Sequence, residues 1–375
     1  MQVIISKTTK GIYKYVIKPI LFLQNPDAVH ERMLKIGRIV QKSKLIRGLL
    51  NSVWSYQNQP KLGQNILGLN FPNPVGIAAG FDKNLELPQL LKSIGFGFME
   101  GGSITYQPCE GNPKPWFYRL PKTKSIVVHA GLANSGVKEV ADRTKNYPPN
   151  TFDNFALNVS VAPTNIKATV KTENAVEDFV NSLTYLKQMG IGEIMTINVS
   201  CPNVQGSELF TNPGNLELLL DRIDKIGLAQ PIFLKMPTDL AWSDFNKLLQ
   251  VAAGHKVVGV TIGNLSKERG TKVIDSLPDN IRGNLSGRPV WDLSNYLIQK
   301  TYQNYQKRFV IIGVGGIFTA QDAYTKIKLG ASLVELITGL IFEGPQLIGA
   351  MNRELAMLME KDGYTNISEA IGVEA

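Results

Sequence analysis

Short apolar runs alternate with longer amphipathic stretches along most of this chain. Eight runs have the length and composition of buried strands, and they cover residues 75–79, 97–103, 155–160, 194–200, 232–236, 257–262, 310–313 and 333–337. Helix-like stretches separate most of them, among them residues 175–188, 216–226, 242–253, 293–306 and 320–329. Eight strands that alternate with helices over roughly 300 residues predict an α/β protein with a (β/α)8 TIM barrel.

A doubly wound open sheet is the alternative fold. Such a sheet with a dinucleotide site carries a GxGxxG turn after its first strand. The first predicted strand is instead followed by Ala78-Ala-Gly-Phe-Asp-Lys83. The missing turn favours the barrel.

Residues 7–50 predict a helical extension ahead of the barrel. Four lysines spaced by three, four and four positions share one helix face, namely Lys7, Lys10, Lys14 and Lys18. The opposite face is apolar and consists of Ile12, Tyr13, Val16, Ile17 and Ile20. A second helix is expected from Asn25-Pro-Asp27 to Val40, because proline is favoured in the first turn. A third covers residues 45–54, and the polar residues 55–65 predict a linker.

The positive charge of the chain is concentrated in this extension. The net charge is +9, yet residues 1–60 hold ten Lys and Arg against two acids, and the remainder holds 30 against 29. A nucleic-acid-binding surface would place basic residues on the main domain, so no nucleic-acid partner is expected. Basic amphipathic helices bind anionic membranes, and residues 1–50 predict such a surface. A helical cap with its lysines in water is the alternative.

The sequence predicts two parts: a helical, membrane-docking segment at 1–55 and a barrel at 60–375. No stretch has the roughly 20 apolar residues of a membrane span. Residues 11–23 are interrupted by Lys14, Lys18 and Pro19, unlike a signal-peptide core. The expected location is therefore peripheral, on the cytoplasmic face of a membrane. The two distant cysteines, Cys109 and Cys201, and three scattered histidines predict neither a disulfide framework nor a metal site.

The most informative segment is Thr196-Ile-Asn-Val-Ser-Cys-Pro-Asn-Val204, a buried strand that ends in a polar turn. In a (β/α)8 barrel the active site lies where the strands end. Cys201 stands there between the carboxamides of Asn198 and Asn203. This arrangement predicts a proton-transfer group inside a substrate clamp. The alternative is a buried structural cysteine beside a turn.

Other predicted strand ends carry amides, hydroxyls and lysines but almost no carboxylates. They supply Lys83, Ser103, Asn158, Lys235 and Asn264. The set suits a neutral heterocycle with an anionic part and lacks the carboxylate pair of a glycosidase. Each lysine alone could instead reach solvent from its strand end.

A glycine turn follows the seventh predicted strand, in Ile311-Ile-Gly-Val-Gly-Gly-Ile317. The next helix begins near Thr319, a predicted N-cap, and the eighth strand is followed by Thr338 and Gly339. Loops seven and eight of this fold commonly bind phosphate through backbone N–H groups and a helix N-terminus. We therefore expect a phosphate site here.

Several of these segments together resemble the dihydroorotate dehydrogenase family of FMN flavoproteins. They occur in family order within residues 60–350 and are Asn73-Pro-Val-Gly-Ile-Ala-Ala-Gly-Phe-Asp-Lys-Asn84, Gly111-Asn-Pro-Lys-Pro115, Arg119-Leu-Pro121, Asn198-Val-Ser-Cys-Pro-Asn203, Leu285-Ser-Gly-Arg-Pro289, Ile311-Ile-Gly-Val-Gly-Gly-Ile317 and Gly330-Ala-Ser-Leu-Val334. The segment Asn25-Pro-Asp-Ala-Val-His-Glu31 resembles the helical extension of the membrane-associated, quinone-reducing class. In that class the extension forms a hydrophobic tunnel to the flavin.

The resemblance implies a role for each matching residue. FMN would be held by Ala79, Gly80, Ser103, Asn158, Asn198, Lys235, Gly287, Gly315, Gly316, Thr338 and Gly339. Dihydroorotate would be held by Lys83, Asn198, Asn203 and Asn264. Cys201 would remove the C5 proton while hydride passes from C6 to flavin N5, and Lys235 would stabilise the anionic reduced ring.

Four departures from the family pattern bear on the substrate. Cys201 stands where the membrane class has serine, and a free thiol ionises more easily than a hydroxyl. Val128 replaces an expected asparagine, and Leu265 replaces a hydroxyl residue. The segment 161–163 replaces a Gly-Lys-Asn run. If the segment Ile262-Gly-Asn264 is aligned as in the soluble class, Val260 and Thr261 would instead lie at the substrate clamp.

The expected function is FMN-dependent oxidation of dihydroorotate to orotate, with electrons passed to a quinone, as in pyrimidine biosynthesis. Loss of a hydrogen-bonding clamp residue costs a polar substrate roughly 1–3 kcal/mol. An alternative is therefore an FMN oxidoreductase for a different dihydropyrimidine or enone, or one that uses a soluble acceptor such as fumarate. A non-catalytic flavin-binding membrane module is a further alternative.

Overall fold

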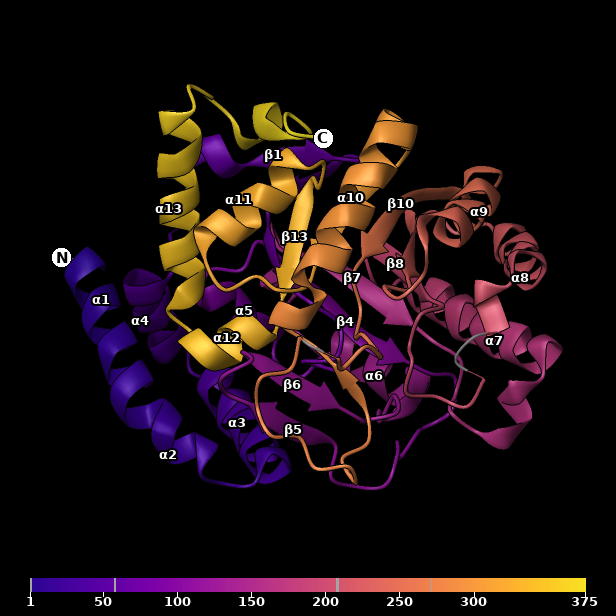
Figure 1. Cartoon of the computed structure of the whole chain (residues 1–375), viewed down its shortest axis with the longest axis horizontal. Coiled ribbons are helices and arrows are strands. Elements are labelled where there is room, and N and C mark those ends of the chain that lie inside the picture. The colour runs from indigo at the N-terminus through magenta and orange to yellow at the C-terminus, as the bar shows by residue number, and fades with distance from the viewer. Residues whose placement is uncertain (1, 57–58, 207–208, 271) are drawn as a thin grey trace.

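The protein forms a closed barrel of eight parallel strands in the computed structural model, which describes residues 2–56, 59–206, 209–270 and 272–375 (Figure 1). The barrel strands are β3 (Val75–Ile77), β4 (Phe98–Ile104), β7 (Ala156–Val161), β8 (Ile194–Asn198), β9 (Ile232–Met236), β10 (Val257–Ile262), β12 (Val310–Val314) and β13 (Leu333–Leu336). Each strand is hydrogen-bonded to the next in chain order, and β13 pairs with β3 to close the ring. The predicted (β/α)8 barrel is confirmed.

Glycines let large side chains fill the amino-terminal end of the barrel. A Cβ at Gly76 would lie 2.4 Å from the Phe98 ring, and one at Gly259 would lie 2.2 Å from the Phe233 ring. Both rings are fully buried in an apolar cluster with Phe71. This packed end supports the polar residues at the opposite, carboxyl-terminal end.

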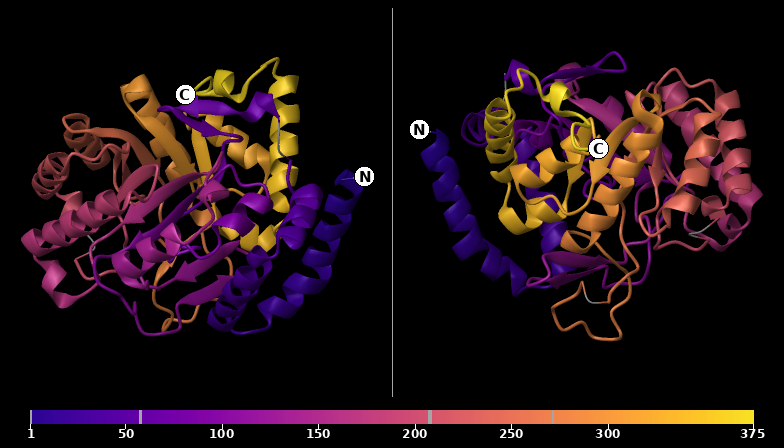
Figure 2. Two further views of the ribbon diagram at one scale, coloured as in Figure 1. Left: turned by 180° about the vertical axis from the view of Figure 1, so that it is seen from behind. Right: turned by 45° about the horizontal axis from the view of Figure 1, so that its top comes forward.

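Helices surround the barrel, as Figures 1 and 2 show. They are α5 (Pro88–Ser93), α6 (Gly136–Lys145), α7 (Thr172–Met189), α8 (Pro213–Ile226), α9 (Trp242–Ala253), α10 (Trp291–Tyr305), α11 (Ala320–Lys328), α12 (Thr338–Glu343) and α13 (Leu347–Lys361). The five helix-like stretches named from the sequence all correspond to helices. Their bounds differ from the predicted ones by at most three residues.

Two smaller sheets lie outside the barrel. The hairpin of β1 (Gln64–Ile66) and β2 (Leu69–Phe71) occupies part of the predicted linker, whose residues 57–58 lie outside the described part of the chain. The second is an antiparallel sheet of β5 (Phe117–Leu120), β6 (Ser125–Val128) and β11 (Asn284–Leu285). This second sheet brings a loop after β10 against a loop after β4, beside the mouth of the barrel.

The first fifty residues are helical, as predicted. They form α1 (Gln2–Ile12), a π-helical turn (Tyr13–Ile17), α2 (Lys18–Phe22), α3 (Pro26–Lys42) and α4 (Lys44–Trp54). The Asn25 side chain accepts the N–H of Ala28 at the start of α3, and Ser43 caps α4 in the same way. This extension packs along one side of the barrel beside α13, with α3 against α5 and β5 (Figure 2). No helix in the described ranges is long and apolar enough to cross a membrane.

Candidate active site

A pocket of about 540 Å³ opens at the carboxyl ends of the barrel strands. Its walls come from the ends of β3, β9, β10, β12 and β13 and from the β11 loop. They include Ala78, Ala79, Lys235, Gly263, Asn264, Leu265, Ser286, Gly287, Val290, Val314, Gly315, Gly316, Ile317, Leu336, Ile337, Thr338 and Gly339. Seven of the residues predicted to hold FMN therefore lie around one pocket.

The glycine turn after β12 forms one end of the pocket. Gly315 and Gly316 have φ angles of 102° and 75°, which favour glycine. A Cβ at Gly316 would lie 2.7 Å from the Trp291 Cβ, and one at Gly339 would lie 2.1 Å from the Ile317 carbonyl. Neither Gly315 nor Gly316 donates its backbone N–H to another group in the described ranges. These free donors suit a phosphate.

The start of α11 differs from the predicted phosphate site. Thr319 is the N-cap as expected, but Asp322 completes a capping box with it. The Asp322 carboxylate accepts the N–H groups of Phe318 and Thr319 at 2.9 and 3.0 Å. It also pairs with Arg288 at 3.3 Å. The N-terminus of α11 is therefore already occupied by the Asp322 carboxylate. The glycine turn and Thr338 remain as hydrogen-bond donors for a phosphate.

Amides and hydroxyls from three strand ends form one hydrogen-bonded cluster. Asn198 donates to the Ser103 hydroxyl at 2.7 Å and accepts from the Ser200 hydroxyl at 3.2 Å. Asn264 donates to the Ser200 hydroxyl at 2.7 Å and to its carbonyl at 3.0 Å. The Ser103 hydroxyl lies 2.8 Å from that of Ser160. The structure thus brings Asn198, Ser103 and Asn264 together.

Asn203 is held in a second group, next to the β5–β6–β11 sheet. Its carboxamide donates to the Val128 carbonyl at 2.9 Å and accepts from the Asn284 carboxamide at 2.7 Å. Its backbone carbonyl accepts from Asn112 at 2.8 Å. Asn112 and Asn284 were missed as site residues, although both lie in or beside sequence segments that resemble the family.

Cys201 lines a separate cavity of about 330 Å³ beneath its loop, together with Asn198, Leu132, Pro163 and Phe210. Burial raises the pKa of the Cys201 thiol to about 11, although a hydrogen bond from Asn203 and the charge of Lys235 act to lower it. The comparison of a free thiol with a serine hydroxyl stays a prediction. In this environment the thiol is protonated near neutral pH.

Lys83 lies outside the walls of the larger pocket. Its ammonium is 5.8 Å from the Trp116 ring centre and 5.6 Å from that of Phe117. Burial lowers the pKa of Lys83 to about 8, while Asp82 and Asp27 oppose this shift. Trp116 donates its ring N–H to the Asn112 carbonyl at 2.6 Å. Lys83 therefore lies next to the Asn112–Asn203 group.

Lys235 is the last residue but one of β9, and its side chain extends into the barrel. Its ammonium forms a buried ion pair with Glu100 at 3.0 Å. Burial acts to lower the pKa of Lys235, but the charge and hydrogen bond of Glu100 act against it, and the pKa of Lys235 is raised. The nearby Asn158 accepts from Thr196 at 2.9 Å, and its own N–H donor is buried without a partner in the described ranges. A fixed positive charge and a free buried donor thus lie below the pocket.

The other two sequence departures, Leu265 and Val128, lie beside these groups. Leu265 lines the pocket directly after Asn264. Val128 contributes its carbonyl to Asn203, while its side chain packs with an apolar cluster around Phe318 and Phe342. Val260 and Thr261 are fully buried within β10, and Asn264 follows the end of that strand and lines the pocket.

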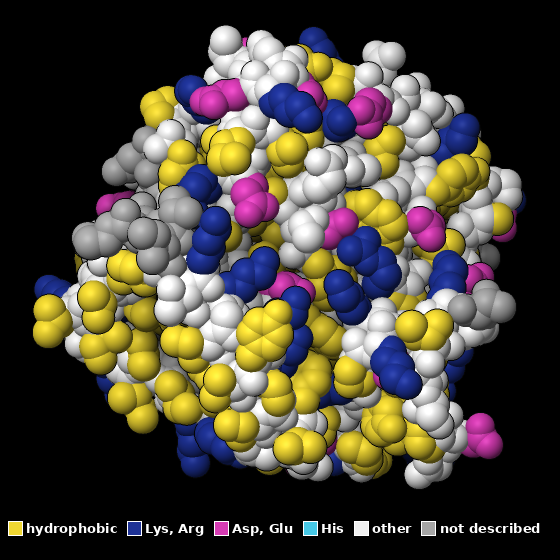
Figure 3. All heavy atoms as spheres, turned by 60° about the vertical axis from the view of Figure 1, so that its left-hand side comes forward, with side chains coloured by type: hydrophobic (Ala, Val, Ile, Leu, Met, Phe, Trp, Pro, Cys, Tyr) yellow, Lys and Arg dark blue, Asp and Glu magenta, His cyan; other side chains and the backbone are white. Residues whose placement is uncertain are grey.

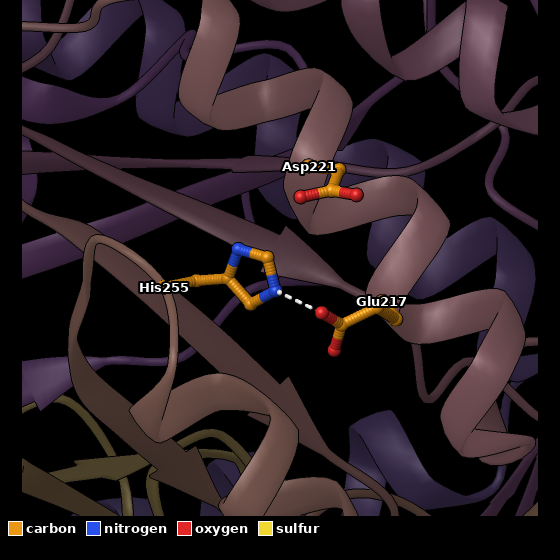
Figure 4. A group of neighbouring side chains, drawn as sticks. All are labelled: Glu217, Asp221 and His255. Atoms are coloured by element: carbon orange, nitrogen blue, oxygen red, sulfur yellow. Dashed lines mark ion pairs between the residues drawn. The ribbon is translucent and has the colours of Figure 1, made fainter.

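A further group of side chains lies on the outside of the barrel, on α8 and after α9. Glu217, Asp221 and His255 have ligand atoms within 4.8 Å of one another (Figure 4). The His255 ring is also 2.9 Å from Asp224 at Nδ1 and 3.4 Å from Glu217 at Nε2. The two ring nitrogens of His255 therefore face Asp224 and Glu217, and among the described residues nothing further at this group indicates a metal ion.

The larger pocket fits FMN in three independent ways. Its glycine turn offers unpaired N–H donors with no room for a Cβ, which suits the phosphate. Its walls of alanine, glycine and leucine admit a planar ring. Lys235 supplies positive charge below the pocket, and Asn158 has an unsatisfied donor there. The fold and the site therefore define a barrel protein built for a phosphorylated planar cofactor.

Comparison with known proteins agrees with this description. The family model described as dihydroorotate dehydrogenase matches residues 61–359. A dihydroorotate dehydrogenase (quinone) of Trichormus variabilis is 33% identical over 379 residues, covering 97% of this chain and 99% of the relative. One of Rhodopseudomonas palustris is 34% identical over 334 residues, covering 87% and 89%. This chain belongs to the dihydroorotate dehydrogenase family.

A solved structure extends the likeness to the whole fold. The crystal structure of DHODH from Eimeria tenella in complex with ferulenol has a TM-score of 0.79 and 26% sequence identity. It covers 96% of this chain and 98% of its own. The helical extension is therefore part of the shared architecture, and the expected family is confirmed.

Proposed function

We propose that this protein binds FMN and oxidises dihydroorotate to orotate, with a quinone as electron acceptor. The observation that carries the proposal is the cluster of Asn198, Ser103, Ser200 and Asn264 beside the glycine-lined pocket. Amides and hydroxyls in this number suit the imide edge of a pyrimidine. The relatives named dihydroorotate dehydrogenase (quinone) support the same reaction.

In this proposal the chain's own residues bind and orient the substrate. Asn198 and Asn264 bind the pyrimidine together with the Ser103 and Ser200 hydroxyls that they contact, and Asn203 completes the clamp from its position on the Val128 carbonyl. Lys83, buried beside Trp116, supplies the positive charge for the substrate carboxylate. FMN, when bound, supplies the hydride acceptor. The residues at its pocket are the expected set from Ala79 to Gly339, with Asn158 and Lys235 beneath.

Cys201 takes the role of the base for the C5 proton. The thiol lines the same cavity as Asn198, together with Leu132, Pro163 and Phe210. Its pKa of about 11 means that the thiolate is scarce at neutral pH. Lys235 partly offsets this effect through its charge. The rate of proton removal then depends on how far bound substrate and FMN lower this pKa.

The helical extension supplies the route for the quinone. Arg119 of β5 donates to the carbonyls of Leu21 and Gln24 at 3.1 and 2.9 Å, and its guanidinium lies 4.7 Å from the Phe22 ring. The Phe22 ring is 5.3 Å from that of Phe342 on α12. Because α12 begins with Thr338 and Gly339 of the pocket, an apolar path leads from the extension to the cofactor.

The outer face of the extension is the proposed membrane surface, with residues 1–55 as the docking segment and 60–375 as the barrel. Apolar side chains are exposed there, namely Ile12, Tyr15, Val16, Ile17, Ile20, Leu23, Met33, Ile36, Ile39, Leu45, Ile46 and Leu49. Apolar side chains gather over the lower part of the face in Figure 3, with lysines and arginines between them. Soluble monomers rarely expose so large a patch, and a basic rim suits anionic lipid.

Steady-state turnover tests the proposal and its rivals together. Purified protein on anionic liposomes is given dihydroorotate with either a short-chain quinone or fumarate as acceptor. We expect orotate to form with the quinone and at a far lower rate with fumarate. Turnover with fumarate alone would identify a soluble acceptor. If dihydroorotate does not reduce the flavin, a different dihydropyrimidine or enone becomes the favoured substrate. Leu265 and Val128 would suit such a substrate.

A further inference from the structure

Two glutamates lie side by side inside the barrel, below the pocket. Glu100 of β4 and Glu335 of β13 are both fully buried. One Glu100 oxygen accepts from the Lys235 ammonium at 3.0 Å. The other Glu100 oxygen and both Glu335 oxygens have no hydrogen-bond partner in the described part of the chain. Three unpaired carboxyl oxygens in one place need a proton donor.

Among the residues that the structure describes, no second cation is available to these carboxyl groups. Lys235 is the cation that acts on them, and the adjoining strands β3 and β12 consist of Val, Ile and Gly residues. On β7 and β8 the inward polar groups are uncharged, as in Asn158 and Thr196. Lys326 of α11 is directed elsewhere, with its ammonium 2.6 Å from the Ser294 hydroxyl. Two carboxylates against one ammonium would leave a net negative charge without water to solvate it.

We propose that Glu335 is a neutral carboxylic acid that donates its proton to Glu100, so that Lys235, Glu100 and Glu335 together carry no net charge. A single shared proton pairs the free Glu100 oxygen and one Glu335 oxygen at once. The arrangement is that of two carboxyl groups that cannot both ionise in a dry site. Burial and the adjacent Glu100 raise the pKa of Glu335 well above its ordinary value.

This proton bears on the cofactor through Lys235, and this part of the inference rests on the proposed function. Negative charge develops on the flavin when it is reduced, and Lys235 would offset that charge. An ionised Glu335 would give the trio a net negative charge next to the flavin, whereas a protonated Glu335 leaves one carboxylate against one ammonium. Glu335 is therefore a positioning residue, which acts by fixing the charge of the trio.

The first experiment detects the proton directly. Infrared spectra of the full-length FMN-loaded protein are recorded at pH 7, with and without carbon-13 glutamate. We expect a protonated-carboxyl C=O band that shifts with the label and is lost in Glu335→Gln, because Glu100 then serves alone as the counter-ion of Lys235. A labelled protein with no such band would overturn the proposal, as would a band that persists in Glu335→Gln.

The second experiment uses the exchangeability of the two carboxyl groups. Glu335→Gln and Glu100→Gln each leave one carboxylate for Lys235, so each should keep bound FMN with a nearly unchanged midpoint potential at pH 7. The double variant leaves the ammonium unpaired, and its melting temperature should fall by much more than the sum of the single effects. The shared proton would be contradicted if the decrease in melting temperature of the double variant equals the sum of the two single decreases. It would also be contradicted if Glu335→Gln alone lowers the melting temperature as much as the double variant does.

These outcomes separate this inference from the proposed reaction. The infrared band and the melting temperatures need no turnover, so they can support the shared proton even if dihydroorotate is not oxidised. Conversely, turnover with dihydroorotate in a protein that lacks the band would overturn the shared proton and leave the proposed function in place.

Discussion

Asn203 donates its side-chain N–H to the backbone carbonyl of Val128 over 2.9 Å. The family pattern leads one to expect an asparagine side chain at position 128, and here the valine side chain packs with Phe318 and Phe342 instead. The backbone of residue 128 therefore positions a clamp residue, while its side chain belongs to the apolar contact between the sheet and α12. Position 128 connects the substrate clamp to the proposed quinone path.

Val128→Asn should strengthen substrate binding. A carboxamide at this position adds a donor and an acceptor beside Asn203, and one such hydrogen bond contributes about 0.5–1.5 kcal/mol. We expect the KM for dihydroorotate to fall between about twofold and tenfold, with the KM for quinone rising because the apolar cluster loses a member. Steady-state kinetics with both substrates varied provides the measurement.

Val128→Thr is the matched control, since it keeps the branched shape and adds only a hydroxyl. It should change the KM for quinone less than Val128→Asn does. A KM for dihydroorotate that rises in Val128→Asn would show that the wild-type clamp has no room for a second carboxamide.

Proton removal by Cys201 predicts a rate that increases with pH. The base must be deprotonated, and burial raises the pKa of the thiol to about 11. The rate of flavin reduction should therefore increase with pH up to the pKa of the thiol in the bound complex. Cys201→Ala should lower this rate by about 10²–10⁴-fold, the usual contribution of a positioned base. Stopped-flow flavin reduction from pH 6 to 10 measures both.

Cys201→Ser provides the control for this assignment, because it keeps a proton acceptor of similar size. Its rate should lie between those of the wild type and Cys201→Ala. A wild-type rate that is independent of pH, together with an unchanged rate in Cys201→Ala, would exclude the thiol as base.

Gly316→Ala should abolish FMN binding. The new Cβ would lie 2.7 Å from the Trp291 Cβ, and the residue has a φ of 75° that alanine adopts with strain. The glycine turn would move away from the phosphate position. We expect at least a hundredfold loss of FMN affinity in a fluorescence titration. Gly254→Ala is the control, since its Cβ meets its nearest neighbour at 3.4 Å and its φ is −77°.

Lys326 should make folding stability depend on pH. Burial lowers its pKa from 10.5 to about 7. Between these values the unfolded chain binds more protons at this site than the folded protein, so the free energy of unfolding rises with pH in that window and falls as pH drops towards 7. Lys326→Met should reduce this slope in urea unfolding from pH 7 to 10. The exposed Lys361→Met should leave the slope unchanged, and equal slopes in all three proteins would contradict the assignment.

The membrane surface can be tested with serine substitutions on the extension. Leu23 and Leu45 are 90% and 84% exposed. Each leucine that enters the lipid contributes roughly 1.5–3 kcal/mol when fully buried, so Leu23→Ser with Leu45→Ser should weaken binding to anionic liposomes by at least tenfold. Leu218→Ser on α8 is the control, because it alters an exposed leucine far from the extension. Equal binding by all three proteins would refute this surface.

Strand ends and caps could be predicted because local sequence determines them. The barrel followed from eight apolar runs, Thr319 was recognisable as a cap, and the start of α3 followed from the proline after Asn25. Asn198 and Asn264 could be placed at strand ends for the same reason. Their mutual contact through Ser200 follows from the neighbourhood of β8, β9 and β10 in the barrel.

Contacts between distant segments could not be predicted in the same way. The β5–β6–β11 sheet joins strands more than 150 residues apart, and β11 has only two residues, too few for a periodic signal. Lys83 turns towards Trp116 because of how that sheet packs. The pKa of Cys201 depends on burial under a loop, and Glu335 meets Glu100 only once the barrel closes.

Anaerobic reduction of the bound flavin tests the central claim most directly. Dihydroorotate is mixed with the purified, FMN-loaded protein in the absence of oxygen, and the flavin absorbance is followed before and after a short-chain quinone is added. The account predicts that the flavin bleaches, that one orotate forms per flavin, and that the quinone restores the colour. A protein that takes up no FMN, or whose flavin stays oxidised with excess dihydroorotate, would contradict it.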